Sequence, residues 1–369
     1  MSKPLSGIVV VELGASVAAP AAGQILGDLG AQVWKIEKAD GDDARKWGPP
    51  FVDGAAATFQ SLNRNKKSVV CDLRDKDQVG KLVDFIVEKA HVVLQNLRPG
   101  QADALGVGAA ALMRKKASLV YCNMGAFGRT GPLSHRPGYD PLMQAFGGIM
   151  SAVGEDGRAP VRVGPSIVDV GTALWAVIGI LSKLHSRTGG IVDVSLFETA
   201  AVWMQMYAAQ YSATGELPKR AGSGQAAIVP YRAYRTTDGD LVVAAGNNSL
   251  FRKLCGVLGH AEWADDARFR DNADRVEHAN ELYAMIEPEM AKRSNAQWTE
   301  RLDAEGVPCA PVQNVGQMLA HEQMAALGLL QQVAGSSIPL LGLPISFDGR
   351  RPDGGNAAPA LGAHTKEIL

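Results

Sequence analysis

The sequence predicts an α/β fold, with a large domain built on a doubly wound, mostly parallel sheet and a smaller α/β domain. Over the first 200 residues, short β-branched runs alternate with stretches of helical periodicity, the pattern of strand–helix–strand units. A weakly patterned, glycine-containing stretch at 214–227 then precedes a second set of strands and helices. The large domain is therefore expected at 1–200 with a return at 329–369, the linker at 201–225 and the small domain at 226–328.

The first strand is expected at Ile8–Leu13, a continuous apolar run typical of strands buried on both faces. Further strands of the large domain are expected at Gln32–Glu37, Ser68–Leu73, His91–Gln95, Leu119–Met124 and Ile191–Leu196. Helices are expected at Pro20–Leu29 and Lys76–Lys89, and a long apolar helix from near Asp169 to Ser186. Alternation of this kind gives a Rossmann-like sheet, whose ligands bind beyond the carboxyl ends of the strands.

Basic residues gather at or just after these strand ends. Lys35, Lys38, Arg74 and Arg98 lie there, and the run Arg64–Lys67 precedes the third strand. Singly, each is typical of a solvated surface charge. Together, at one edge of a parallel sheet, they indicate a site for an anionic ligand such as a polyphosphate.

Composition excludes several other classes of protein. The net charge of −1 gives no general field for nucleic acid or an anionic membrane. The seven histidines show no H-E-x-x-H spacing, so no metal site is expected, and no G-x-S-x-G elbow occurs. The four cysteines form no C-x-x-C pair, which favours reduced thiols in a cytoplasmic protein. The uncharged run Val170–Leu181 is shorter than the roughly 20 residues that span a bilayer.

Asp169 is a single acid at the start of that uncharged run, just after Gly164 and Pro165. One interpretation is a helix N-cap, whose side-chain oxygen accepts from the free N–H groups of the first turn. In that position the helix dipole would keep the carboxylate ionised. The other interpretation is a nucleophile, since an ionised carboxylate attacks activated carbonyls. The residues alone leave both open.

A series of short segments, in order and spacing, resembles the family III CoA-transferases, a group that includes formyl-CoA:oxalate and carnitine CoA-transferases and the α-methylacyl-CoA racemases. The resemblance covers essentially the whole chain. Its segments are Val10–Leu13, Pro20–Gly30, Val33–Glu37, Asn63–Ser68, Asp72–Arg74, Asn96–Gly100, Gly125–Gly128 with Gly131 and Pro132, Arg136–Asp140, Val163 and Gly164 with Asp169, Gly190–Leu196, and Leu361–Thr365.

The resemblance implies that Asp169 is the catalytic nucleophile of a CoA-transferase. It implies that the first-half loops hold coenzyme A, through Val17, Lys38, Leu73, Arg74, Asn96, Leu97, Arg98 and Tyr139. The substrates would be an acyl-CoA and a carboxylic acid, without a permanently bound cofactor or a metal. The reaction would pass through an aspartyl anhydride and an aspartyl-CoA thioester. The resemblance also implies an interlocked homodimer.

Some positions depart from the family pattern. Ala104 stands where many members carry an arginine, and Gly222–Gln225 is less glycine-rich than the mobile loop of the formyl-CoA enzyme. An α-methylacyl-CoA racemase is the alternative activity on this fold. It needs two proton carriers, but this chain has Tyr139 and the amide-containing Gly246–Ser249 where the family's racemases have His and Glu. In a non-enzymatic CoA-binding scaffold, Asp169 would only cap its helix.

Overall fold

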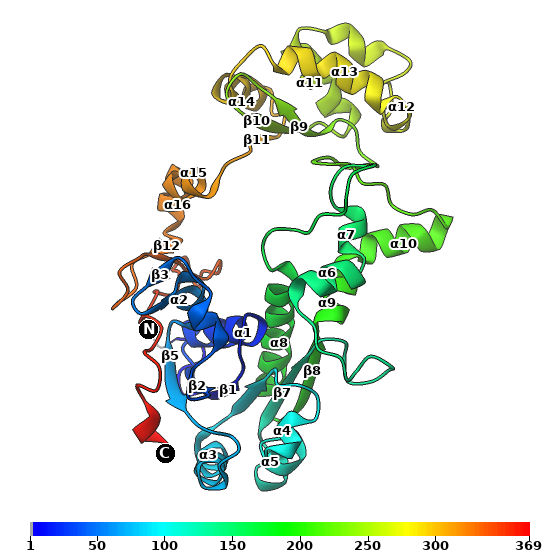
Figure 1. The fold of residues 1–369 in the computed structure, drawn as a ribbon. Coiled ribbons are helices and arrows are strands. Elements are labelled where there is room, and N and C mark those ends of the chain that lie inside the picture. The colour runs from blue at the N-terminus through cyan, green and yellow to red at the C-terminus, as the bar shows by residue number, and fades with distance from the viewer. Residues whose placement is uncertain (1–2) are drawn as a thin grey trace. The chain divides into compact units, whose positions relative to one another are not determined.

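The computed structural model describes residues 3–369, which form two compact units (Figure 1). Unit 1 combines the chain up to Ile149 with Val163–Met206 and His321–Leu369. Unit 2 combines Met150–Arg162 with Tyr207–Ala320. The expected linker 201–225 contains the end of helix α9 (Leu196–Trp203) and all of α10 (Gln205–Thr214). The domain boundaries proposed from the sequence stay a prediction.

Unit 1 is built on a six-stranded sheet of order β5-β2-β1-β6-β7-β8, in which every neighbouring pair is parallel. The predicted α/β class with a doubly wound sheet is therefore confirmed for this unit. The strands are β1 (Val9–Leu13), β2 (Gln32–Glu37), β5 (Lys66–Val70), β6 (Val92–Gln95), β7 (Val120–Gly125) and β8 (Gly190–Ser195).

The order of the strands fixes where a ligand can bind. From β1 the chain winds to β2 and β5 on one side, and it then returns to place β6, β7 and β8 on the other. The loops that follow β1 and β6 therefore leave the sheet in opposite directions and open a crevice between them. Helix α3 (Lys76–Lys89) covers one face of the sheet, where Leu82 and Ile86 pack among Val11, Leu13 and Trp34.

The opposite face of β1 and β2 carries a buried ion cluster. Lys35 Nζ lies 2.9 Å from Glu12 Oε1 and 2.9 Å from Asp42 Oδ2, and Lys66 Nζ lies 2.8 Å from Glu12 Oε2. All four side chains are buried, and burial lowers the pKa of Lys66 to about 8. The cluster also holds the loop after β1, because Lys35 donates to the Gly14 carbonyl and Asp42 accepts from Ser16 N–H.

The expectation that all the basic residues near the strand ends face a ligand is wrong for three of them. Lys35 and Lys66 belong to the buried cluster, and buried Arg64 donates to Asp28 through Nε at 3.0 Å. The third strand, predicted at Ser68–Leu73, runs over Lys66–Val70 in the structure. Its first residue pairs inside the protein instead of marking a solvated turn.

Helix α8 (Ile167–Ser186) is the core helix of unit 1. Its buried side includes Val168, Ala173, Ala176 and Ile180. By length and composition it is the one helix among residues 3–369 long and apolar enough to cross a membrane, with a mean hydropathy of 1.7. Its burial within unit 1 identifies it as a partly buried helix of a soluble domain. The opposite side exposes an apolar stripe of Val170, Leu174, Trp175 and Ile178.

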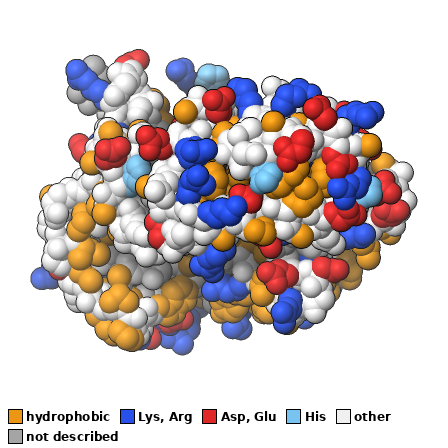
Figure 2. Space-filling view, turned by 90° about the horizontal axis from the view of Figure 1, so that it is seen from above, with side chains coloured by type: hydrophobic (Ala, Val, Ile, Leu, Met, Phe, Trp, Pro, Cys, Tyr) orange, Lys and Arg blue, Asp and Glu red, His pale blue; other side chains and the backbone are white. Residues whose placement is uncertain are grey.

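Unit 2 contains a three-stranded antiparallel sheet of order β11-β10-β9 with helices packed beside it. The strands are β9 (Tyr231–Arg235), β10 (Asp240–Ala244) and β11 (Cys309–Pro311), and the helices of its core are α11 (Asn248–Leu258), α13 (Ala279–Met290) and α14 (Asn295–Ala304). Trp298 lies at its centre and donates from Nε1 to the Met290 carbonyl. Basic and acidic side chains lie among one another on the face of the molecule drawn in Figure 2.

Two glycines inside helices test the buried ion cluster. A Cβ at Gly23 in α1 (Ala18–Asp28) would lie 1.9 Å from Glu12 Oε2, whereas one at Gly80 in α3 meets nothing within 4 Å. Gly23→Ala should therefore lower the free energy of unfolding by about 2–3 kcal/mol, because the displaced carboxylate is buried and paired with Lys66. Gly80→Ala should raise it by up to about 1 kcal/mol through helix propensity.

Denaturant unfolding of both variants beside the wild type measures the difference. An equal effect of the two substitutions would show that the Glu12 carboxylate is free to move, and the rigid role given to the cluster would then be wrong.

Candidate active site

The crevice between β1 and β6 is closed at its base by one side chain. Asn96, directly after β6, accepts from Ala15 N–H at 3.0 Å through Oδ1 and donates from Nδ2 to the Ala15 carbonyl at 2.8 Å. Together with the Lys35 and Asp42 contacts to Gly14 and Ser16, these bonds fix three successive residues of the loop after β1. The crevice is therefore rigid where a ligand would enter.

A cavity of about 200 Å³ lies at this point. Its lining includes Val17, Asn96, Leu97, Arg98, Tyr139 and Asp169, all predicted from the sequence as site residues. The rest of its lining is Ala15, Ser16, Ala18, Pro99, Met124, Gly125, Ala126, Arg136, Pro137, Gly138 and Leu196. Loops far apart in the sequence thus converge around one carboxylate.

Lys38, Leu73 and Arg74 do not line this cavity. Lys38 follows β2 and forms an exposed ion pair with Asp43 at 2.8 Å. Arg74 follows β5 and pairs with Asp72 at 3.1 Å, and Leu73 packs against the apolar core beneath. These residues stand after the two strands on the other side of β1, so only a long ligand would reach them from the cavity.

Asp169 is the third residue of α8 and does not cap it. The N-cap residue is Ser166, and no side-chain cap bond is made by this helix itself. The N–H groups of Val168 and Asp169 instead donate to Asp140 Oδ2, at 2.8 and 3.2 Å. The interpretation of Asp169 as a helix cap is therefore wrong, because Asp140 already serves the free N–H groups. Within residues 3–369 the Asp169 carboxylate itself accepts no hydrogen bond.

The environment of Asp169 favours its protonated form. Burial, and secondly the nearby charge of Asp140, raise the pKa of the Asp169 carboxyl from 3.8 to about 7. The expectation that the helix terminus keeps this carboxylate ionised is not met, because burial and the charge of Asp140 both raise its pKa. An aspartate with a pKa near neutrality in a cavity is typical of a catalytic group.

Asp140 and Gln144 are site residues to which sequence reasoning assigned no role. Both lie on α6 (Asp140–Phe146), where Gln144 donates to Asp140 Oδ1 at 2.6 Å and accepts from Val163 N–H at 2.9 Å. Helix α6 therefore orients both the cap of α8 and the segment that leads into it. The signals in the sequence were the place of Asp140 in the segment Arg136–Asp140 that resembles the family and the Asp-Pro pair, typical of a helix start.

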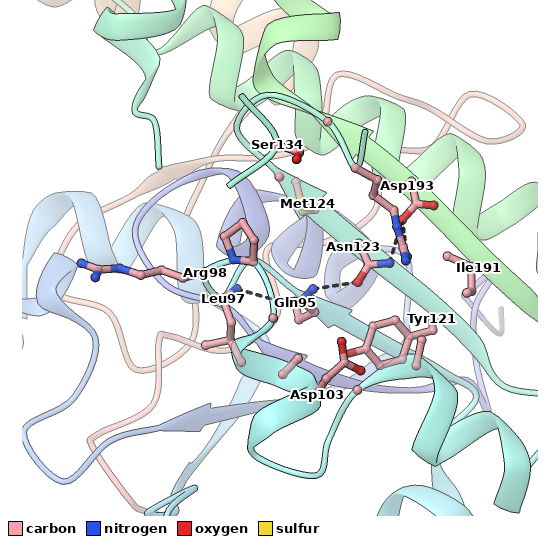
Figure 3. Close-up of a pocket in the computed structure, with 18 of the residues that line it drawn as sticks. Gln95, Leu97, Arg98, Asp103, Tyr121, Asn123, Met124, Ser134, Ile191 and Asp193 are labelled. Atoms are coloured by element: carbon pink, nitrogen blue, oxygen red, sulfur yellow. Dashed lines mark hydrogen bonds and ion pairs between the residues drawn. The ribbon is translucent and has the colours of Figure 1, made fainter. Parts of the chain in front are cut away.

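A second cavity, of about 590 Å³, adjoins the first and shares with it Leu97, Arg98, Pro99, Met124 and Gly125. It lies over the carboxyl ends of β6, β7 and β8 (Figure 3). Its polar lining includes Gln95, Asp103, Asn123, Arg129 and Asp193. The Leu97–Arg98 turn thus stands between the two cavities.

The fold and the site define a doubly wound α/β enzyme with a lone carboxylate at the topological reversal of its sheet. The model of CoA-transferase family III matches residues 5–365. The chain belongs to this family, and it moves CoA between an acyl donor and a carboxylate acceptor.

Named relatives cover nearly the whole chain. It is 32% identical to the succinyl-CoA:glutarate CoA-transferase of Mus musculus over 375 residues, which cover 100% of this chain and 86% of the relative. It is 35% identical to the acetyl-CoA:oxalate CoA-transferase of Acetobacter aceti over 352 residues, 94% of this chain and 90% of the relative. A CaiB/BaiF family protein from Brucella suis has a solved structure that superposes with a TM-score of 0.90 at 36% identity, covering 100% of this chain and 99% of that one.

The raised pKa of Asp169 predicts a pH-dependent stability. The folded state binds this proton more tightly than the unfolded chain does, so the stabilisation is complete below about pH 4 and is lost as the pH rises through about 7. Asp169→Asn has no proton to lose. The melting temperature of the variant relative to the wild type should therefore rise between pH 4 and 7 and then level off.

Thermal unfolding at a fixed protein concentration measures this, with Asp84→Asn, a substitution of an exposed side chain on α3, as the control for a lost surface acid. A constant difference between Asp169→Asn and the wild type over this range would contradict the raised pKa.

Proposed function

We propose that Asp169 is the nucleophile of this CoA-transferase and that its side chain carries the acyl group and then CoA. The observation that carries the proposal is that Asp169 is the only acid lining the small cavity and is released from any capping role by Asp140. Its pKa near 7 leaves a substantial ionised fraction at neutral pH. A desolvated carboxylate without hydrogen-bond donors is also a stronger nucleophile than a solvated one.

The reaction proceeds in two symmetrical halves. An Asp169 carboxylate oxygen attacks the thioester carbonyl, the C–S bond breaks, and an anhydride and the CoA thiolate form. The thiolate then attacks the Asp169 carbonyl carbon, which leaves an aspartyl-CoA thioester and frees the donor acid. The acceptor carboxylate then attacks the carbonyl carbon of the aspartyl-CoA thioester, which forms a second anhydride and releases the CoA thiolate. The thiolate attacks the acceptor's acyl carbon in that anhydride and forms the product acyl-CoA. Asp169 returns as a carboxylate, and each step exchanges one acyl bond for another.

Coenzyme A is proposed to enter across Val17, Asn96, Leu97, Arg98 and Tyr139. Helix α1 begins after Val17 without a side-chain cap, so the N–H groups of its first turn are oriented for an anionic oxygen of the ligand. Arg98 supplies a cation at the same cavity. Beyond it, Lys38, Leu73 and Arg74 at the ends of β2 and β5 are proposed to contact the distal ADP part, as a long ligand along the sheet edge would require.

The acceptor is proposed to be a dicarboxylic acid. Both relatives described above are named for such acceptors, glutarate and oxalate. In this chain Arg136 lines the same cavity as Asp169, and its Cζ lies 5.8 Å from the centroid of the Phe127 ring. Among residues 3–369 its guanidinium has no carboxylate partner. A second carboxylate on the substrate would give it one.

The racemase alternative is not favoured by the second half of the chain. Asn247 caps α11 by accepting from Leu250 N–H at 2.9 Å, and Asn248 donates to Asp271 at 2.6 Å. Both amides thus serve local structure, and an amide cannot shuttle a proton in the way that an α-proton transfer requires.

An interlocked cytoplasmic homodimer is proposed as the working form. The exposed stripe on α8, with Trp175 and Ile178, is a run of large apolar side chains on one helix face, which favours a protein partner. All four cysteines are free thiols, as a reducing compartment predicts.

Asp169→Asn should abolish transfer by at least about three orders of magnitude, because an amide cannot form the anhydride. The variant should still fold, since Asp140 provides the helix cap, and its CoA affinity should be nearly unchanged, since the amide has the same shape. Steady-state transfer from succinyl-CoA to glutarate, with isothermal titration of CoA, measures both quantities. Asp77→Asn in the first turn of α3 is the matched control and should keep full activity. Retained transfer in Asp169→Asn would refute the nucleophile.

Arg98→Glu should weaken CoA binding by about ten- to a hundredfold, since it replaces a charge-assisted contact at the cavity with repulsion. Lys38→Glu should have a smaller effect, because Lys38 is exposed and already paired with Asp43. Titration of CoA at two salt concentrations measures both, with Arg252→Glu, a substitution of an exposed side chain on α11, as the control. Unchanged affinity after reversal of both Lys38 and Arg98 would contradict the proposed binding site.

A further inference from the structure

A row of polar side chains crosses three strands at the edge of the large cavity. Gln95, Asn123 and Asp193 are direct neighbours in the register of β6, β7 and β8, so their side chains lie on the same face of the sheet. Gln95 Nε2 donates to Asn123 Oδ1 at 2.7 Å, and Asn123 Nδ2 donates to Asp193 Oδ1 at 2.7 Å. Figure 3 shows the three joined end to end.

The row ends on the turn that separates the two cavities. Gln95 Oε1 accepts from Leu97 N–H at 2.8 Å. Leu97 and Arg98 line both cavities, and Gln95 is itself buried. The backbone of the proposed CoA-binding turn is therefore held by a side chain whose own orientation depends on its neighbour.

The chemistry of Asp193 fixes the direction of every bond in the row. An ionised carboxylate only accepts hydrogen bonds, so Asn123 must turn its NH₂ group toward Asp193 and its oxygen toward Gln95. Gln95 must then donate to Asn123, which leaves its oxygen for Leu97 N–H. Arg129 Nη1 lies 3.3 Å from the same oxygen, Asp193 Oδ1, and forms an ion pair with it. Without the acceptor at the far end, Asn123 Nδ2 has no partner in the row, so Asn123 and, through it, Gln95 are held less firmly, although Leu97 N–H still requires the Gln95 oxygen.

We propose that Asp193 is a positioning residue for the acyl-CoA substrate, acting through Asn123 and Gln95 on the Leu97–Arg98 turn. The inference rests on the proposed role of that turn in binding CoA. Asp193 stands on β8 and lines the large cavity, not the small cavity that Asp169 lines. Its effect should therefore fall on substrate binding and spare the chemical step.

Two substitutions at Asp193 separate its acceptor role from its charge. Asp193→Ala removes the acceptor. The Kd of CoA and the KM of succinyl-CoA should then rise about five- to tenfold, because about one net hydrogen bond is lost. The kcat should change less than about twofold. Asp193→Asn loses the same charge but keeps an oxygen for Asn123 Nδ2, so its Kd and KM should stay within about twofold of the wild type. Asp84→Ala on α3 is the control for a lost surface acid.

A double-mutant cycle tests the path through Gln95. Gln95→Met removes the acceptor of Leu97 N–H at nearly constant volume and should raise the Kd of CoA as Asp193→Ala does. The double variant Gln95→Met/Asp193→Ala should bind no more weakly than Gln95→Met alone, because the path is already broken. Additive effects in the double variant, or equal losses in Asp193→Ala and Asp193→Asn, would overturn the proposal.

Different results would contradict the CoA-transferase function and the positioning role of Asp193. If the wild type binds no CoA, or if Asp169→Asn retains transfer, the function is wrong and the positioning role falls with it. If the wild type binds CoA, Asp169→Asn is inactive and Asp193→Ala binds CoA as the wild type does, only the positioning role is wrong.

Discussion

The contact of the Asp140 carboxylate with the first turn of α8 is the interaction on which the site depends. It satisfies the N–H groups of Val168 and Asp169 from another helix, so the aspartate within that turn is left without a structural task. It also places a second negative charge beside Asp169, which adds to burial in raising the pKa of the Asp169 carboxyl. One carboxylate thus sets both the position and the protonation of the other.

The rigidity of the crevice has a separate origin in the buried ion cluster. Glu12, Lys35, Asp42 and Lys66 lie side by side without solvent, where ion pairs gain strength only if their geometry is maintained. The cluster uses that geometry to hold Gly14 and Ser16 while Asn96 holds Ala15. A cofactor-sized substrate therefore meets a loop that is already ordered, which lowers the entropy lost on binding.

The sequence predicted those features that local patterns determine. The β-branched runs predicted the six parallel strands, each overlapping the observed one. The strand Gln32–Glu37 and the helix Lys76–Lys89 match to the residue. The uncharged run predicted the helix that carries Asp169. The sequence did not predict which cations are buried, because Lys66 pairs with Glu12, which lies more than fifty positions earlier in the chain. It gave no role to Asp140 either, since a cap supplied by a different helix leaves no local pattern at the helix it serves.

Trapping of the covalent intermediate shows directly whether Asp169 becomes acylated during turnover. Wild-type enzyme would be mixed with succinyl-CoA, quenched with hydroxylamine, digested and mapped by mass spectrometry. We expect a hydroxamate on the peptide that contains Asp169 and on no other acidic residue, with none formed when succinyl-CoA is omitted. A hydroxamate at another carboxylate, or an unmodified Asp169 in enzyme that turns over, would contradict it.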